Sequence, residues 1–121
     1  MENGVMMQYF EWYLPNDGKH WQHLAEDASH LKNIGISKVW MPPAFKGTGS
    51  NDVGYGVYDL YDLGEFNQNG TVRTKYGSRE DYLNAVNALK EQEIMPISDI
   101  VLNHQANGAA KDRFPVVKVH P

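Results

Sequence analysis

The 121-residue chain contains no cysteine, which excludes disulfide bridges and metal sites built from thiolates. It also lacks a strong charge of either sign, because its formal net charge is only −4. Nucleic acid and anionic membrane surfaces therefore have no electrostatic support as partners. The N-terminus shows neither a basic region nor the apolar run of a secretory signal. We therefore expect a cytoplasmic protein, or a secreted one if the natural N-terminus lies elsewhere.

What the sequence does contain is typical of a globular domain, with 41% hydrophobic and 21% charged residues. The length suits one ordinary domain with its own core. Aromatic residues are frequent: there are seven Tyr, four Phe and three Trp. Many of them lie in expected loops, where they suit either a site that stacks on flat apolar faces or a tight aromatic core.

Hydrophobic periodicity predicts strands that alternate with helices. Residues 5–10 form a short apolar run typical of a buried strand. Apolar side chains then recur every three or four residues over 21–34, which predicts an amphipathic helix that ends at Gly35. A second strand is predicted over 36–41, where two prolines end it. A loop of roughly thirty residues follows, and structureless loops of that length usually carry function.

The second half of the chain repeats this alternation. Ser78 and Asp81 form a capping-box pattern that opens the next helix. The run 97–102 predicts a buried parallel strand, and we expect Pro96 at its beginning, where proline is tolerated. Alternating strands and helices imply βαβ units and a parallel sheet. Because three parallel strands leave two open edges, the pattern predicts an α/β fold that is the first part of a larger barrel or doubly wound domain.

Two polar residues, Asn103 and His104, directly follow the third predicted strand. In α/β folds the carboxyl ends of the strands surround the functional crevice. The amide oxygen of Asn103 is a hard neutral ligand that suits Ca²⁺, and His104 can bind a substrate hydroxyl or act as an acid or base. Alternatively, Asn103 caps a turn and His104 is an ordinary loop residue.

The long loop contains an aromatic residue between two glycines, Gly54-Tyr55-Gly56. Glycines let the backbone approach a ligand closely, and the Tyr55 ring suits stacking on a sugar. Alternatively, Tyr55 is part of an aromatic plug. No spacing singles out a catalytic pair among the loop carboxylates, and we expect most of them to be solvated: Asp52, Asp59, Asp62 and Glu65.

Three histidines fall on or beside the first predicted helix: His20, His23 and His30. Histidines three residues apart can mimic a metal site, but no carboxylate or further ligand is positioned with them. We therefore expect all three to be solvated surface residues.

Several segments, in the right order, resemble the α-amylase family and in particular its bacterial liquefying-type branch. These segments are residues 7–13, 15–18, 39–44, 54–66, 70–77 and 99–104. The resemblance implies a (β/α)₈ barrel, which needs about 250 residues. Residues 1–104 would then form the first three β/α units of an incomplete barrel, and residues 105–121 the start of a small inserted β domain.

The resemblance also implies roles for single residues. Tyr55 matches the tyrosine that stacks on the glucose ring beside the cleaved bond, and His104 matches the histidine that contacts the same ring. Gln8 is a candidate for a more distant sugar contact. Asn103 matches the asparagine that binds the structural calcium, whereas Asp99 matches a position that suggests a buried structural carboxylate.

The activity that the resemblance implies is endo-hydrolysis of α-1,4 bonds in starch or glycogen with retention. The family's nucleophilic aspartate, its general-acid glutamate and its third carboxylate lie on later strands, so we expect no catalytic residue in this chain. Retaining hydrolysis needs two carboxyl groups about 5–5.5 Å apart, and we therefore expect these 121 residues alone to be inactive. The alternatives are a non-catalytic glucan-binding fragment, or part of a related (β/α)₈ glycosidase or glycosyl-transferring enzyme.

Overall fold

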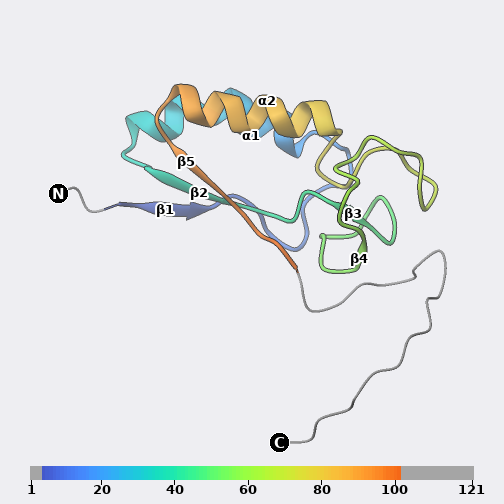
Figure 1. Ribbon diagram of the computed structural model, residues 1–121. Coiled ribbons are helices and arrows are strands. Elements are labelled where there is room, and N and C mark those ends of the chain that lie inside the picture. Colours follow the sequence, from blue (N-terminus) through green and yellow to red (C-terminus); the bar gives the residue numbers. More distant parts are fainter. Residues whose placement is uncertain (1–3, 102–121) are drawn as a thin grey trace, which may run out of the picture.

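The computed structural model describes residues 4–101, and a sheet with two helices on one of its faces makes up most of this part (Figure 1). The elements follow one another in the order β1 (Met6–Gln8), α1 (His20–Asn33), β2 (Lys38–Met41), β3 (Lys46–Gly47), β4 (Val57–Asp59), α2 (Arg79–Glu91) and β5 (Met95–Ser98).

The main sheet has the strand order β1-β2-β5, and both strand pairs are parallel. In this register Gln8 lies opposite Trp40, which in turn lies opposite Ile97. Helices α1 and α2 connect the strands and pack against each other on the same face of the sheet (Figure 1). The predicted three-stranded parallel sheet and its two helical connections are therefore confirmed.

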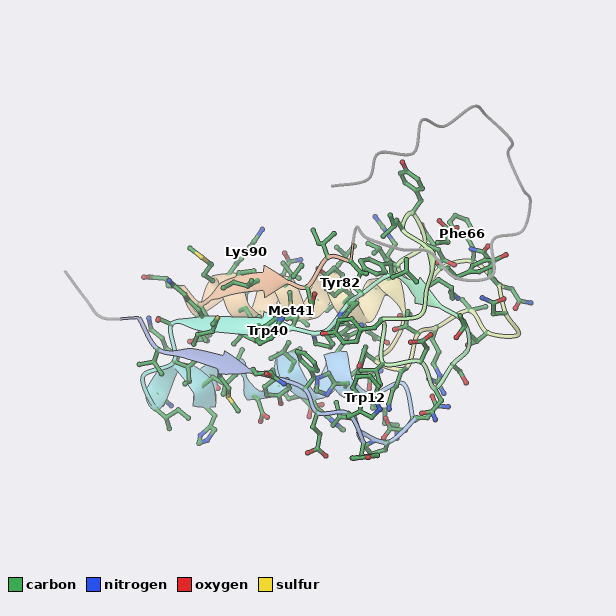
Figure 2. All side chains as sticks on the ribbon, turned by 90° about the horizontal axis from the view of Figure 1, so that it is seen from below. Trp12, Trp40, Met41, Phe66, Tyr82 and Lys90 are labelled. Carbon is green, nitrogen blue, oxygen red and sulfur yellow. The ribbon has the colours of Figure 1, made fainter. Side chains whose placement is uncertain are left out.

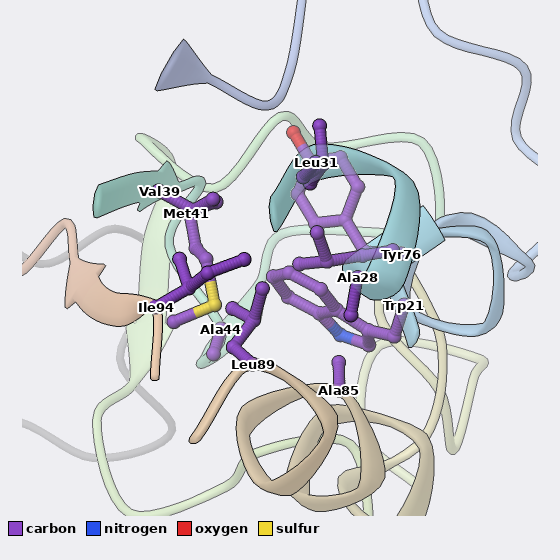
Figure 3. Close-up of a cluster of buried hydrophobic side chains, with 11 residues drawn as sticks. Trp21, Ala28, Leu31, Val39, Met41, Ala44, Tyr76, Ala85, Leu89 and Ile94 are labelled. Atoms are coloured by element: carbon purple, nitrogen blue, oxygen red, sulfur yellow. The ribbon is translucent and has the colours of Figure 1, made fainter. Parts of the chain in front are cut away.

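The hydrophobic core lies between the helices and the sheet face that they cover (Figure 3). Trp21 and Leu24 of α1 are fully buried, as is Leu89 of α2. The ring of Tyr76 enters the same core from the long loop, with its centroid 5.4 Å from that of Trp21. Burial raises the pKa of the Tyr76 phenol, whose hydroxyl donates to the Val53 carbonyl at 2.7 Å.

Local signals define the ends of both helices. The Ser78 hydroxyl accepts from the Asp81 backbone N–H at 3.2 Å, and the Asp81 carboxylate accepts in return from the Ser78 N–H. The predicted capping box is thus confirmed. Helix α1 ends at Asn33, and Gly35 follows at φ = 92°, a left-handed conformation that glycine adopts without strain. Neither helix in the described range is long and apolar enough to cross a membrane.

Two predicted strands differ from the structure. The predicted third parallel strand is present, but β5 covers Met95–Ser98 instead of 97–102. None of its residues is buried, so the prediction that this strand is buried is wrong. Likewise, β1 covers only Met6–Gln8 and all three of its residues are exposed. Among the described elements, both strands lie at sheet edges and no helix covers the face opposite α1 and α2 (Figure 1). Pro96 is the second residue of β5, close to the predicted position.

The long loop is not structureless. It contains the antiparallel pair β3 and β4, with Lys46 opposite Asp59 and an irregularity between Lys46 and Gly47. We call residues 42–78 the loop layer and the sheet with its two helices the helical layer. Periodicity could not predict β3 and β4 because each is too short for an alternating pattern to appear.

Candidate functional site

A buried ion pair organises the loop layer. The side chains of Lys46 and Asp62 are both fully buried, with Nζ 3.5 Å from Oδ2. The ammonium also donates to the carbonyl oxygens of Phe66 and Thr71 at 2.8 Å, and to that of Val72 at 2.5 Å. Burial lowers the pKa of Lys46, although the neighbouring Asp62 opposes this shift. The Lys46 side chain therefore connects distant parts of the loop through its ammonium group.

Both carboxylate oxygens of Asp62 have hydrogen-bond partners. Its carboxylate accepts from the backbone N–H groups of Gly64, Glu65 and Phe66, and from the Gln68 side chain at 2.9 Å. Burial alone would raise the pKa of Asp62, but these hydrogen bonds outweigh it and hold that pKa below its usual range. Asp62 is therefore an exception to the expectation that most loop carboxylates are solvated, because the loop folds its own amides around the carboxylate.

Asp52 shapes the turn that carries the aromatic residue. Its carboxylate accepts from the backbone N–H of Thr48 at 2.9 Å and from the Thr48 hydroxyl at 2.7 Å. It also accepts from the backbone N–H groups of Gly54 and Gly56, the two neighbours of Tyr55. Burial acts to raise the pKa of Asp52, yet the hydrogen bonds leave it lowered. Asp52 is therefore a structural turn residue rather than a solvated one.

Glycine is required at one side of this turn. Gly54 has φ = 118°, and a Cβ placed there would lie 2.6 Å from the Cβ of Pro43. A side chain would thus meet both backbone strain and a clash. The Pro43 ring and the Asp52 carboxylate together fix where the backbone presents Tyr55.

Tyr55 joins the loop layer to the end of the third strand of the sheet. Its hydroxyl donates to the carboxylate of Asp99, the residue that directly follows β5. Burial and the Asp99 carboxylate raise the pKa of Tyr55 to about 12. The ring is only partly buried and lies parallel to that of Trp12, with an interplanar angle of 5° and centroids 6.2 Å apart. Tyr55 is thus a fixed aromatic ring beside the carboxyl ends of the strands.

The remaining predicted site residues lie apart from this turn or outside the described range. Gln8 ends β1, where its amide donates to the Phe10 carbonyl at 3.1 Å. It lines a depression of about 340 Å³ together with Tyr9 and His20. Asn103 and His104 lie outside residues 4–101, so their roles stay predictions.

Asp99 is partly buried and holds Tyr55, which agrees in part with the structural role that the resemblance implied. His20 corrects the prediction for the helix histidines, because it is only 9% exposed and packs among Tyr9, Trp21 and Tyr76. Burial lowers the pKa of its imidazole. Its ring lies 2.5 Å from the Tyr9 carbonyl oxygen, so it is a core residue.

No cluster of three or more His, Asp or Glu side chains that could hold a metal occurs within residues 4–101. The buried carboxylate of Asp62 already binds Lys46 and backbone amides, and the partly buried carboxylate of Asp52 is occupied by its own turn. Calcium needs six to eight oxygen ligands, and these two side chains do not fit it. A calcium site would have to be built on other residues, with Asn103 as the predicted contribution from this chain.

A family model described as the catalytic domain of α-amylase matches residues 14–114. The chain belongs to the α-amylase family. This confirms the resemblance based on the sequence motifs. The matched segment spans both layers of the described structure, including the Tyr55 turn.

Two bacterial relatives are much longer than this chain. A glucan 1,4-alpha-maltohexaosidase of Bacillus sp. (strain 707) is 60% identical over 98% of the chain, which spans 23% of that protein. A cytoplasmic alpha-amylase of Escherichia coli is 46% identical over 99% of the chain, which spans 24% of that protein. The chain therefore corresponds to about a quarter of the length of these curated relatives.

Solved structures show the same arrangement of elements. A truncated alternansucrase from Leuconostoc mesenteroides matches 79% of the chain with a TM-score of 0.69 and 26% sequence identity, and the match covers 10% of that protein. The α/β fold is thus that of an α-amylase catalytic domain. The sequence did not predict the organising roles of three residues, Trp12, Asp52 and Lys46. An aromatic residue just after a strand was the available signal for Trp12.

Proposed function

We propose that the intact protein that carries this chain is an α-amylase that cleaves internal α-1,4-glucosidic bonds of starch or glycogen with retention. The observation that carries the proposal is the Tyr55 ring, which Asp99 and the Asp52 turn hold beside the carboxyl ends of the parallel strands. A rigid aromatic face in this place suits the apolar face of a glucose ring. The identity of 60% to a protein named a maltohexaosidase supports the same substrate class.

The larger architecture is part of this proposal. Residues 1–104 would form the first three β/α units of a (β/α)₈ barrel, and residues 105–121 would begin the domain inserted after the third strand. The open edges of β1 and β5 support this division, because a barrel closes by pairing such edges. Asn103 would contribute to a structural calcium site, and His104 would contact the same glucose ring as Tyr55. A cytoplasmic location stays a prediction.

Within the proposal, the described residues bind and orient the substrate rather than react with it. Retaining hydrolysis needs a nucleophilic carboxylate and a carboxylic acid about 5–5.5 Å apart. Within residues 4–101, the Asp99 carboxylate is engaged by the Tyr55 hydroxyl, and Asp52 and Asp62 are engaged by loop amides. The reacting carboxylates would therefore come from other parts of the intact protein.

The test is the stereochemistry of the product. The intact natural protein is mixed with maltoheptaose, and the anomer that forms first is followed by proton NMR before mutarotation. We expect the α-anomer, with kcat/KM reduced about tenfold or more for Tyr55→Ala because the sugar loses its stacking surface. Product that forms first as the β-anomer, or no cleavage of any α-glucan, would contradict the proposal.

A further inference from the structure

The loop layer contains an Asn-Gly dipeptide, Asn69-Gly70, in an exposed tight turn. The flanking residues Gln68 and Thr71 pair across the turn, with N···O distances of 3.0 and 3.1 Å. Asn69 has φ = 54° and Gly70 has φ = 79°, the two positive angles that a type I′ turn requires. Figure 2 shows Phe66, which lies shortly before this turn, at the loop end of the molecule. Neither the resemblance nor the comparisons assign any role to the turn.

The two groups of this dipeptide that can react with each other are both accessible. The backbone nitrogen of Gly70 donates no hydrogen bond to any atom of residues 4–101, and within this range the space beside its Cα is open. The exposed Asn69 side chain makes one hydrogen bond, from Nδ2 to the Gly47 carbonyl oxygen at 2.9 Å. One such bond at the surface is a small obstacle to rotation of the side chain.

Two asparagines of α2 provide an internal comparison. Asn84 and Asn87 are also exposed, but Ala85 and Ala88 follow them. Both alanines lie inside the helix, where the backbone N–H donates to the carbonyl oxygen of the preceding turn. The helix therefore holds the nitrogen that would attack the neighbouring amide, whereas Gly70 has neither this hydrogen bond nor a Cβ.

We propose that Asn69 is a site of spontaneous deamidation, with solvent water as the co-reactant. The Gly70 backbone nitrogen attacks Cγ of Asn69, and the new C–N bond closes a succinimide ring. The bond from Cγ to Nδ2 breaks, and this nitrogen leaves as ammonia with the proton that the Gly70 N–H gives up. Water then opens the ring without oxidation or reduction. Cleavage of the bond from the nitrogen to Cγ yields aspartate, and cleavage of its bond to the backbone carbonyl carbon yields isoaspartate.

The effect of this reaction on the loop layer follows from the contacts of the turn. The Gln68 side chain donates to the carboxylates of Asp59 and Asp62, in each case at 2.9 Å. The Thr71 carbonyl oxygen accepts from the Lys46 ammonium at 2.8 Å. Isoaspartate adds a methylene group to the backbone between Gln68 and Thr71, so their pairing loses its register. Deamidation should therefore loosen a turn that helps to hold the buried ion pair of Lys46 and Asp62.

The experiment follows the amide over time in the intact natural protein at mildly alkaline pH. Peptide mapping by mass spectrometry measures aspartate and isoaspartate at position 69, with Asn84 as the internal reference. The rate at Asn69 should be about fivefold below that in an unstructured peptide of residues 66–73, because one ordinary hydrogen bond must open first. It should exceed the rate at Asn84 by at least about tenfold, because a helical turn must open there.

Asn69→Gly is the matched variant, because glycine keeps the left-handed conformation but carries no amide. Amide hydrogen exchange at Thr71, whose N–H donates to the Gln68 carbonyl, should rise about fivefold or more as the wild type ages. Exchange at the same residue should stay constant over the same time in Asn69→Gly.

The outcomes are distinct from those that test the proposed function, since none depends on cleavage of an α-glucan. A rate at Asn69 no higher than that at Asn84 would overturn the deamidation site. Deamidation with unchanged exchange at Thr71, or the same rise in exchange in aged Asn69→Gly, would overturn its link to the loop layer.

Discussion

The helical layer and the loop layer of this chain have interiors of different chemistry. Between α1, α2 and the sheet, the interior is apolar, with side chains such as Leu24 and Leu89. In the loop layer, the buried groups include the charges of Lys46 and Asp62, and the carboxylate of Asp52 is partly buried; each is held by hydrogen bonds. Apolar burial tolerates small shifts of register, whereas hydrogen-bonded charges fix direction and distance. The layer that presents Tyr55 is thus the one that is built from directional contacts.

The largest expected effect on this difference comes from removing the Asp62 carboxylate at the centre of the loop layer. Asp62→Ala should lower the free energy of unfolding by about 3–5 kcal/mol, because the Lys46 ammonium is left buried without its counter-ion. The backbone amides of Gly64 and Glu65 also lose their acceptor. Denaturant unfolding of the intact protein measures the loss, and amide hydrogen exchange should place it in residues 42–78 first.

A core truncation provides the matched control for this prediction. Leu89→Ala should cost about 2–5 kcal/mol through the cavity that it leaves, and its increased exchange should begin in α1 and α2. If Asp62→Ala costs less than about 1 kcal/mol, as an exposed ion pair would, the charged centre does not organise the loop. If both variants show the same exchange pattern, the two layers unfold as one unit and the contrast between them is lost.

Sequence reasoning predicted the helical layer better than the loop layer, and the reason is physical. The apolar period of three and four residues around Trp21 and Leu24, and the capping box at Ser78, are local signals that the chain carries wherever it folds. The contacts of Lys46 reach to residues 20 to 26 positions away. No spacing rule identifies such a partner before the fold is known.

The candidate site shows the same division. Tyr55 was predicted from its flanking glycines, which are a local signal for a close backbone approach. Its partner Asp99 is 44 positions away, and only the parallel pairing of β2 with β5 places the two side chains together. The Lys75 ammonium is likewise 63 positions away from Trp12, whose carbonyl oxygen accepts from it. Residue type could therefore suggest that Tyr55 stacks on a sugar, but these contacts could not be predicted without the tertiary structure.

Low pH should sharpen the comparison, because among the described residues the carboxylates with lowered pKa values, Asp52 and Asp62, both lie in the loop layer. Burial would raise the pKa of Asp52, but the bonds from Thr48, Gly54 and Gly56 lower it. The unfolded carboxyl group titrates near pH 3.9, so its stabilisation is fully present above about pH 4 and is lost as the pH falls through the lower folded pKa. Melting temperatures should therefore fall with pH in this acid range. In Asp52→Asn the acid dependence should be weaker, and an unchanged slope would show that Asp52 does not contribute.

The smallest expected effect lies at the boundary of the two layers, where Ser78 caps α2. Ser78→Ala should lower the free energy of unfolding by about 1 kcal/mol, because the Asp81 N–H loses the hydroxyl that caps the first turn of α2. Lys19→Ala is the matched control, since Lys19 holds the same position before α1 but makes no side-chain capping bond there; it should change the free energy of unfolding by less. The next residue, Arg79, donates its backbone N–H to the Gly64 carbonyl of the loop layer at 3.2 Å. If amide hydrogen exchange in Ser78→Ala increases both in α2 and around Gly64, the cap couples the two layers. An increase confined to α2 would show that the cap stabilises the helix alone.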